Sequence, residues 1–455
     1  MKHTRLLSKL IATAEALIML TICLAGCGGK TDDPNEKEYF TEDGKVSRYA
    51  FPRNTVQISD YLYYIELYTY NEDTTGGGKL KRQGERVVRL SLKTGNVSSA
   101  CLDPVCTHMH GSDCPLNIDN YYDKGKRIFE LRAVGDWLFY IISEPYKSDD
   151  PNINPSDIAQ KIMTYMVYNT VTGESRELFP HSSVGESGAT PAIMNAKSYG
   201  DLIFVLVPEF VKDENGNESL VYSLMRHDVK KDETKTIYTS SKSFGIPAVT
   251  NKRIYILSDK DGVTKGSSLD WDGQNMRENE IIFPANLAYG TREYYTGSES
   301  SFSVWVYNIE THESKKLDIS TNSGDYCISN GVLYYSTLSN LDEYLNLDFD
   351  KIYEKYSNLD PLESFRASSR DINSVQYGGK AQIYAADLDG GSPKLLFEYE
   401  HMVIKCVAAA GNYLYAYISS AQPPEYTVES TENEGFSRID LTTGEITPVP
   451  LLGAE

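Results

Sequence analysis

The sequence predicts an all-β fold, a β-propeller of seven blades with one short helical insertion. Three observations lead to this prediction. Short aromatic strands recur along the chain, each entered through a polar or glycine turn, and each is followed by a hairpin-like segment. The closest repeats, at Arg253, Arg292 and Val332, are 39 and 40 residues apart, which is the usual size of one blade. Because a single unit cannot bury both of its faces, such units pack radially around a channel.

The first kind of repeat is a turn followed by an aromatic strand. If Arg253 and Arg292 belonged to one blade with a long insertion, six blades would result, and eight also stays open. A parallel solenoid is the main competing architecture, but it would show more even spacing. The segments are ISDYLYYI (58–65), VGDWLFYI (134–141), YGDLIFVL (199–206), TNKRIYIL (250–257), YGTREYYT (289–296), SNGVLYYS (329–336) and AGNYLYAY (410–417).

The second kind of repeat consists of a strand, a tight polar turn and another strand. Its turns contain Thr-Gly, Asp-Gly or Gly-Gly, which tolerate the positive φ of hairpin turns. We therefore assign residues 51–450 to the propeller. The segments are VVRLSLKTGNV, YMVYNTVTGES, YSLMRHDVKKDE, SSLDWDGQN, VWVYNIETHES, IYAADLDGGSP and SRIDLTTGEIT.

Residues 339–358 carry the periodicity of a helix inserted within the propeller. Ser339 with Asp342 resembles a capping box. We expect this helix to cover one end of the propeller. Its predicted apolar face consists of Leu341, Leu345, Phe349, Ile352 and Tyr356.

The first 26 residues have the layout of an export signal. Lys2, Arg5 and Lys9 precede a short apolar run, Ala16 to Ala25, that ends in small residues. The run is too short for a permanent transmembrane helix. We therefore predict that residues 1–26 are a signal peptide.

The segment LAGC, Leu24 to Cys27, resembles a bacterial lipobox. By that resemblance Cys27 receives a diacylglyceryl group with palmitate-type chains and becomes the first residue of the mature lipoprotein. Two acyl chains anchor a protein stably. Residues 27–50 begin with small and polar residues, so we expect a flexible tether. The predicted location is the extracellular face of the cell membrane.

The chain is acidic, with a formal net charge of −20. This charge disfavours nucleic acid and anionic lipid headgroups as partners. It is compatible with cations, a carbohydrate or a basic protein. The membrane contact is therefore expected through the lipid anchor alone.

The segment CLDPVCTHMHGSDCPL, residues 101–116, concentrates metal-binding residue types. Cys101, Cys106, His108 and Cys114 would make a Cys3His set suited to tetrahedral zinc, with His110 as an alternative ligand. The segment lies between the first two units of the repeat. A cross-linked loop would therefore fix the seam between two blades.

A disulfide in this loop stays open beside the metal. Exported proteins often oxidise their thiols. One of the three cysteines would then be left over, unless it reached Cys327 or Cys406. The histidines, otherwise unexplained, favour the metal. A catalytic Cys106–His108 pair is disfavoured because nothing marks an oxyanion hole.

The segments IYAADLDGGSPKLLF and SRIDLTTGEITPV resemble blades of TolB-like propellers with YVTN-like texture, and of related propeller lipoproteins of Gram-positive gut Firmicutes. The Cys loop is similar to a Cys-Asp-Pro-x-Cys-x-His cluster in such lipoproteins. The resemblance covers residues 50–450 and implies a surface lipoprotein. It implies no activity, and the chain lacks an evident TolB-type N-terminal α/β domain.

No motif of a known catalytic site appears in the sequence. Three hypotheses follow for function. The first, which we favour, is a non-catalytic binding or scaffold module for a protein or glycan. The second is a carbohydrate-active propeller enzyme, which would need two facing carboxylates. The third is a metal-binding surface protein.

Overall fold

The structure is a computed structural model of the 455-residue chain. The chain divides into two compact units, Met1–Tyr39 and Phe40–Glu455, and all the strand residues described below except Tyr39 belong to the second. In the described part of the chain, no helix is long and apolar enough to span a bilayer. The structure describes residues 39–41, 55–73, 79–106, 114–119, 127–145, 161–178, 196–212, 216–249, 253–260, 263–281, 305–308, 313–316, 326–329, 331–387, 392–424, 426 and 435–450.

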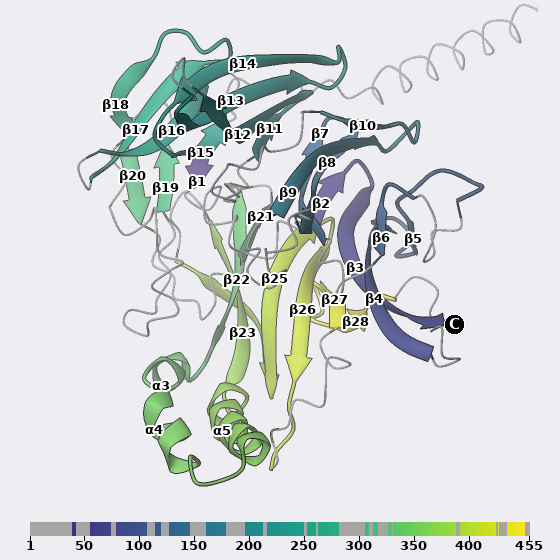
Figure 1. Ribbon diagram of the computed structural model, residues 1–455. Coiled ribbons are helices and arrows are strands. Elements are labelled where there is room, and N and C mark those ends of the chain that lie inside the picture. The colour runs from purple at the N-terminus through teal and green to yellow at the C-terminus, as the bar shows by residue number, and fades with distance from the viewer. Residues whose placement is uncertain are drawn as a thin grey trace, which may run out of the picture. The chain divides into compact units, whose positions relative to one another are not determined.

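The strands that the structure describes form seven sheets, which we number as blades in chain order (Figure 1). Blade 1 contains β2 (Thr55–Ile58), β3 (Tyr61–Asp73), β4 (Lys79–Ser91) and β5 (Val97–Ser99), with β6 (Asn117–Asp119) also paired to β4. Blade 2 contains β7 (Arg127–Val134), β8 (Trp137–Pro145), β9 (Lys161–Asn169) and β10 (Ser175–Glu177). Blade 3 contains β11 (Ala196–Tyr199), β12 (Leu202–Lys212), β13 (Glu218–Asp228) and β14 (Glu233–Ser240).

The remaining blades continue this pattern along the chain. Blade 4 contains β15 (Phe244–Val249), β16 (Arg253–Lys260), β17 (Val263–Asp270) and β18 (Arg277–Ile281). Blade 5 contains β1 (Tyr39–Thr41), β19 (Trp305–Asn308) and β20 (Glu313–Lys316). Blade 6 contains β21 (Tyr326–Ser329), β22 (Val332–Leu338), β23 (Lys380–Asp387) and β24 (Lys394–Glu400). Blade 7 contains β25 (Met402–Ala410), β26 (Tyr413–Ser420), β27 (Gly435–Asp440) and β28 (Ile446–Pro448).

The first strands of successive blades contact one another. Strand β7 contacts β2 and β11, and β11 contacts β15. On the other side β25 contacts β21 and β2. Sheets of four consecutive strands that meet through their first strands are the arrangement of a propeller. The predicted all-β propeller is confirmed. The predicted segment 289–296 lies outside the described residues.

The turn chemistry of the repeat explains why its sequence recurs. In blade 2 the side chain of Asn169, at the end of the third strand, accepts the N–H groups of Val171 and Thr172, each at 2.9 Å. Gly173 closes the turn with φ of +79°, which glycine adopts without strain. Asp228 and Asp440 accept two turn N–H groups in the same way in blades 3 and 7.

Each of these turns is also tied to the turn between the first two strands of its blade. In blade 2 the N–H of Thr170 donates to the carbonyl oxygen of Asp136 at 2.9 Å. The same bond joins Leu92 to Asp60, Val229 to Asp201, and Leu441 to Asn412. The Gly-Asp turn between the first two strands and the Thr-Gly turn after the third strand are therefore hydrogen-bonded to each other.

The hydrophobic core lies between the blades. Separate clusters of buried side chains join blades 1 and 2, 2 and 3, 3 and 4, 6 and 7, and 7 and 1. At the last seam Leu62 and Tyr64 of blade 1 pack with Tyr415 of blade 7. Among the described strands, blades 7 and 1 share no sheet, because each is built from its own consecutive strands. Side-chain packing therefore holds the seam between them.

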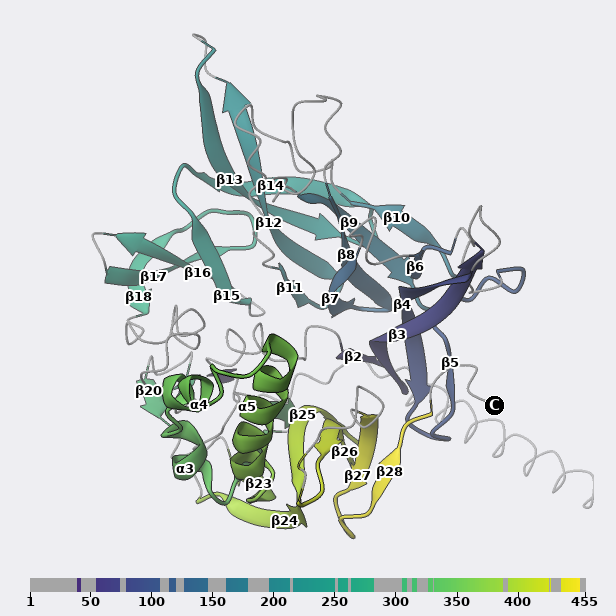
Figure 2. The same cartoon turned by 60° about the horizontal axis from the view of Figure 1, so that its bottom comes forward.

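The helical insertion between β22 and β23 is longer than predicted and is broken. It consists of α3 (Leu341–Leu345), α4 (Phe349–Lys355) and α5 (Pro361–Gln376), which gather beside those strands (Figures 1 and 2). The predicted segment 339–358 therefore misses α5. The chain restarts at Asp348, whose side chain accepts the N–H of Lys351 at 3.0 Å and begins α4.

The predicted cap and apolar face of the insertion also differ from the structure. The residue that caps α3 is Asn340, and Ser339 accepts the N–H of Lys380 at 2.9 Å instead. Leu341 is buried against Val403, but Phe349 is 41% exposed. No residue of α4 is buried, so the predicted apolar face does not continue into this helix.

Candidate metal centre

The cysteine loop leaves and rejoins the same strand. The outer edge of β4 pairs with β5 through residues 88–90 and with β6 through residues 84–86. Between them, Val87 donates to the carbonyl oxygen of Leu116 at 2.8 Å and accepts the N–H of Ala100 at 3.2 Å. Val87 thus bonds the backbone at both ends of the loop. These bonds fix the positions of Ala100, next to Cys101, and Leu116, two residues after Cys114.

A tight turn brings the middle cysteine back towards the first. The side chain of Asp103 accepts the N–H of Val105 at 3.0 Å, and its carbonyl oxygen accepts the N–H of Cys106 at 3.2 Å. Pro104 suits this turn because its φ is fixed and it needs no hydrogen-bond partner for an N–H. The turn at residues 103–106 is therefore stabilised by hydrogen bonds to Asp103.

The sulfur atoms of Cys101, Cys106 and Cys114 all lie within 4.8 Å of one another. Thiolates around a tetrahedral zinc ion lie about 3.8 Å apart, as a Zn–S bond of about 2.3 Å requires. The three sulfurs are thus close to one face of such a tetrahedron. In the described part of the chain, Cys101, Cys106 and Cys114 form no disulfide bond. The donor set fits a thiophilic metal ion.

Burial sets the electrostatics of this thiol cluster. Cys101 and Cys114 are each 6% exposed. Burial, with a smaller contribution from Cys101, raises the pKa of the Cys114 thiol well above its usual value. A buried thiol without a cation therefore keeps its proton. A bound metal ion must displace that proton, so its affinity falls as the pH falls.

The thiol cluster lies at the seam between blades 1 and 2. Cys101 and Cys114 belong to the same core cluster as Leu138 of blade 2. The hydroxyl of Tyr140 donates to the carbonyl oxygen of Pro115 at 3.0 Å, and the hydroxyl of Tyr168 accepts the N–H of Leu102 at 2.6 Å. Burial raises the pKa of Tyr168 to about 12. Two strands of blade 2 thus hold the loop of blade 1.

The other predicted site residues fall into two groups. His108, His110 and the predicted lipidation site Cys27 lie outside the described residues. Cys327 and Cys406 lie together in the core between blades 6 and 7, in a cluster that does not include the loop cysteines. Neither is therefore a disulfide partner for the loop in this structure.

One feature of the molecule was missed by sequence reasoning: a cleft between blades 3 and 4 that contains Tyr199, Arg226 and Trp271. A signal was present in the sequence. Trp271 follows Asp270, which begins the turn after the third strand of its blade as Asn169 and Asp440 do in blades 2 and 7. The residues that follow there are Thr170 and Leu441, so a tryptophan is unusual at this position.

Comparisons with known proteins return matches in solved structures alone. No protein-family model and no curated protein sequence matches this chain. The β-propeller domain of the Trilobed protease from Pyrococcus furiosus is 12% identical, with 72% of this chain and 71% of that chain covered and a TM-score of 0.28. A putative 6-phosphogluconolactonase from Bacteroides uniformis is 11% identical, with 84% and 97% covered and a TM-score of 0.36.

An acylaminoacyl peptidase from Pyrococcus horikoshii is 10% identical, with a TM-score of 0.41. The alignment covers 87% of this chain and 52% of the peptidase, so this chain spans about half of that protein's length. The assignment of the fold depends on the sheet order and the strand contacts of this chain.

Proposed function

We propose that this protein is a lipid-anchored propeller on the extracellular face of the cell membrane that binds a protein or carbohydrate partner. In this proposal the cysteine loop holds a zinc ion that fastens blade 1 to blade 2. The observation that carries the metal part of this proposal is the convergence of three sulfur atoms at a seam between blades.

The metal part of the proposal assigns Cys101, Cys106 and Cys114 as thiolate ligands and His108 as the fourth ligand. Soft thiolate and imidazole groups select zinc, iron or copper over calcium or magnesium. With all four positions taken by the protein, the ion has a structural role, because a catalytic zinc keeps one position open.

The anchor part of the proposal assigns Cys27 as the lipidated residue. Two acyl chains at Cys27, followed by the tether 27–50, would hold the propeller close to the membrane. Detergent partitioning and labelled-palmitate incorporation test this in the native host. The intact chain should enter the detergent phase, and Cys27→Ala should stay in the aqueous phase.

The second candidate function is a carbohydrate-active enzyme, and one observation bears on it. Burial raises the pKa of Glu85, as in a general acid. Glu85 nevertheless accepts the N–H of Ile128 at 2.7 Å and faces Arg127 at 3.9 Å, so it joins blade 1 to blade 2. This structural use accounts for the buried carboxylate, so Glu85 does not favour the enzyme.

Capture from the native cell surface, combined with a glycan array, tests the binding function. The purified, metal-loaded protein should retain a discrete partner or a defined glycan without altering it. Hydrolysis of a captured glycan would favour the enzyme. Absence of any partner in both experiments would contradict the binding function.

A further inference from the structure

A cleft of about 830 Å³ lies between blades 3 and 4. Its volume is within the range of roughly 300–1,000 Å³ that small-molecule sites occupy. Two aromatic rings, Tyr199 and Trp271, share this cleft with charged side chains of both signs. The charged lining residues are Asp201, Arg226, Asp228, Lys230, Lys231, Glu233 and Lys235.

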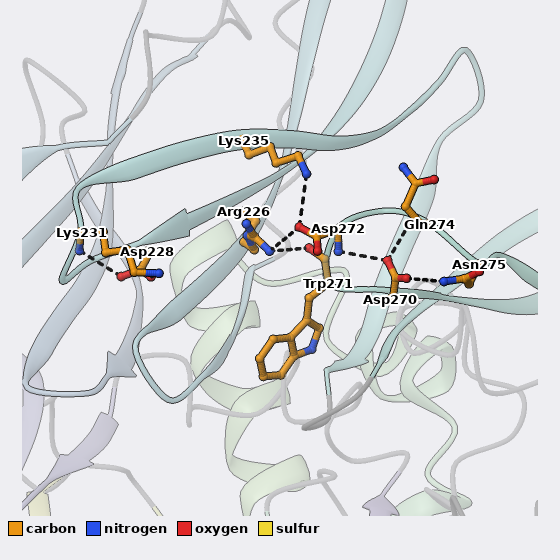
Figure 3. A network of polar contacts seen from close by, with 9 residues as sticks. All are labelled: Arg226, Asp228, Lys231, Lys235, Asp270, Trp271, Asp272, Gln274 and Asn275. Atoms are coloured by element: carbon orange, nitrogen blue, oxygen red, sulfur yellow. Dashed lines mark hydrogen bonds and ion pairs between the residues drawn. The ribbon is translucent and has the colours of Figure 1, made fainter.

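Trp271, which lines the cleft, lies in a hydrogen-bonded turn (Figure 3). The carboxylate of Asp270 accepts the N–H groups of Asp272 at 3.1 Å and of Gln274 at 2.7 Å, and the side-chain amide of Asn275 at 2.7 Å. Three donors on one carboxylate hold it ionised, and the pKa of Asp270 is lowered, chiefly by the Gln274 bond. The turn 270–275 is thus organised before any ligand arrives.

The turn 270–275 is also fixed against blade 3. Gly273 has φ of +78°, and a Cβ atom there would collide with the carbonyl oxygen of Ile237. On the cleft side Arg226 donates to the carbonyl oxygen of Trp271 at 2.9 Å and to the Asp272 carboxylate at 3.0 Å. The turn 270–275 is therefore in contact with β13 through Arg226 and with β14 through Ile237.

The ring of Trp271 packs against two aromatic rings of blade 3, is only partly buried, and lines the cleft. Its centroid lies 5.5 Å from that of Tyr199 and 6.5 Å from that of Phe204. A partly exposed indole in a pre-organised turn offers a flat apolar face. Such a face suits the C–H side of a sugar ring, which is both apolar and rigid.

Most of the charged side chains that line the cleft are paired, all of them except Glu233. Asp272 bridges Arg226 and Lys235, at 3.0 and 3.2 Å. Lys230 pairs with Asp201 at 2.7 Å, and Lys231 pairs with Asp228 at 3.3 Å. The pKa of Asp272 is lowered by Lys235 first and Arg226 second, so this carboxylate stays ionised.

Because the charges of opposite sign are paired, the cleft offers both hydrogen-bond donors and acceptors. Its electrostatic potential is neither strongly positive nor strongly negative. A ligand with many hydroxyl groups uses both kinds of group, and bonds to charged partners are stronger than neutral ones. From these contacts we propose that the cleft between blades 3 and 4 binds a neutral carbohydrate stacked on Trp271.

This inference rests on the proposed binding function and names its ligand class and site. The test is titration of the full-length protein with neutral trisaccharides: cellotriose, maltotriose, xylotriose and mannotriose. The galacturonate trimer and a glutamate decapeptide are run beside them. We expect saturable binding of at least one neutral trisaccharide, with little dependence on salt.

Variants locate the binding site. Trp271→Ala should weaken binding by at least about tenfold, as removal of a central aromatic contact does. Lys235→Gln should weaken it less and should leave the unfolding temperature unchanged, since Lys235 is at the surface. The matched controls are Phe365→Ala, an aromatic residue 65% exposed on α5, and Lys351→Gln, an ion-paired lysine on α4.

Three results would overturn the inference: no neutral trisaccharide binds, only the galacturonate trimer or the peptide binds, or folded Trp271→Ala and Lys235→Gln bind as the wild type does. A surface partner that both variants still capture would overturn this site and leave the proposed function intact. Failure of the wild type to capture any partner or glycan would contradict both.

Discussion

Cys106 is the single residue on which the metal proposal depends most. It is less buried than Cys101 and Cys114, and the Asp103 turn carries its sulfur to the other two. Loss of its thiolate would open the metal site and leave the surrounding core in place. A substitution here therefore reports on the metal more than on packing.

We expect Cys106→Ser to lower the free energy of unfolding by about 1–3 kcal/mol, in the range of single substitutions that break a defined interaction. Thermal unfolding with and without a chelator measures this. The chelator should lower the unfolding temperature of the wild type and leave that of the variant unchanged. Equal unfolding temperatures together with an unchanged metal content would refute the prediction.

His227 predicts a dependence of stability on pH. It is 2% exposed, its Nδ1 lies 2.8 Å from the Thr234 hydroxyl, and its Nε2 lies 3.8 Å from Asp232. Burial lowers its pKa below the ordinary 6.5, with Arg176 adding to the effect and with Asp232 and Asp228 opposing it. The folded protein therefore keeps this imidazole neutral.

Because the folded pKa lies below the unfolded one, the unfolded chain takes up the proton first as the pH falls. Stability from His227 is present above about pH 6.5 and is lost as the pH falls towards the folded pKa. Urea unfolding at several pH values measures the slope. His227→Gln should show a shallower loss below pH 6.5 than the wild type, and identical slopes would contradict the assignment.

Among the elements, α5 owes its first turn to one side chain. The carboxylate of Asp360 accepts the N–H groups of Leu362 at 3.0 Å and Glu363 at 3.2 Å, and Pro361 follows it. Both features favour a helix start at this residue. Asp360 therefore fixes the boundary between α4 and α5.

We predict that Asp360→Ala destabilises the protein by about 0.5–2 kcal/mol, the usual cost of losing an N-cap. Hydrogen exchange should speed up in the first turn of α5 and remain unchanged in β22 and β23. The exposed Glu354→Ala in α4 is the control and should change neither. Unaltered exchange in Asp360→Ala would show that packing alone holds the helix start.

For the whole molecule, the sequence predicted the sheets well because the repeat is encoded locally. Each turn signal contains its own hydrogen-bonding side chain, such as Asn169 or Asp440, so it can be recognised within a few residues. The division of the insertion into three helices was not predicted. The apolar residues of 339–358 keep a helical spacing across Asp348, although a new helix begins there.

The cysteine loop and the cleft between blades 3 and 4 also differ in how far the sequence predicts them. The cysteine loop was visible because its three sulfurs come from one short segment. The cleft was not visible, because Arg226 and Trp271 come from different blades and each looks ordinary in its own strand or turn. Contacts between blades are set by packing over long sequence distances, and a local pattern does not contain them.

Native mass spectrometry of the intact, purified protein tests the central claim, a metal-fastened seam between blades 1 and 2, most directly. We predict one zinc ion per wild-type chain, lost in Cys106→Ser and released on acidification. A metal-free chain whose mass is lower by two hydrogens, with the disulfide mapped to the loop cysteines, would contradict the claim.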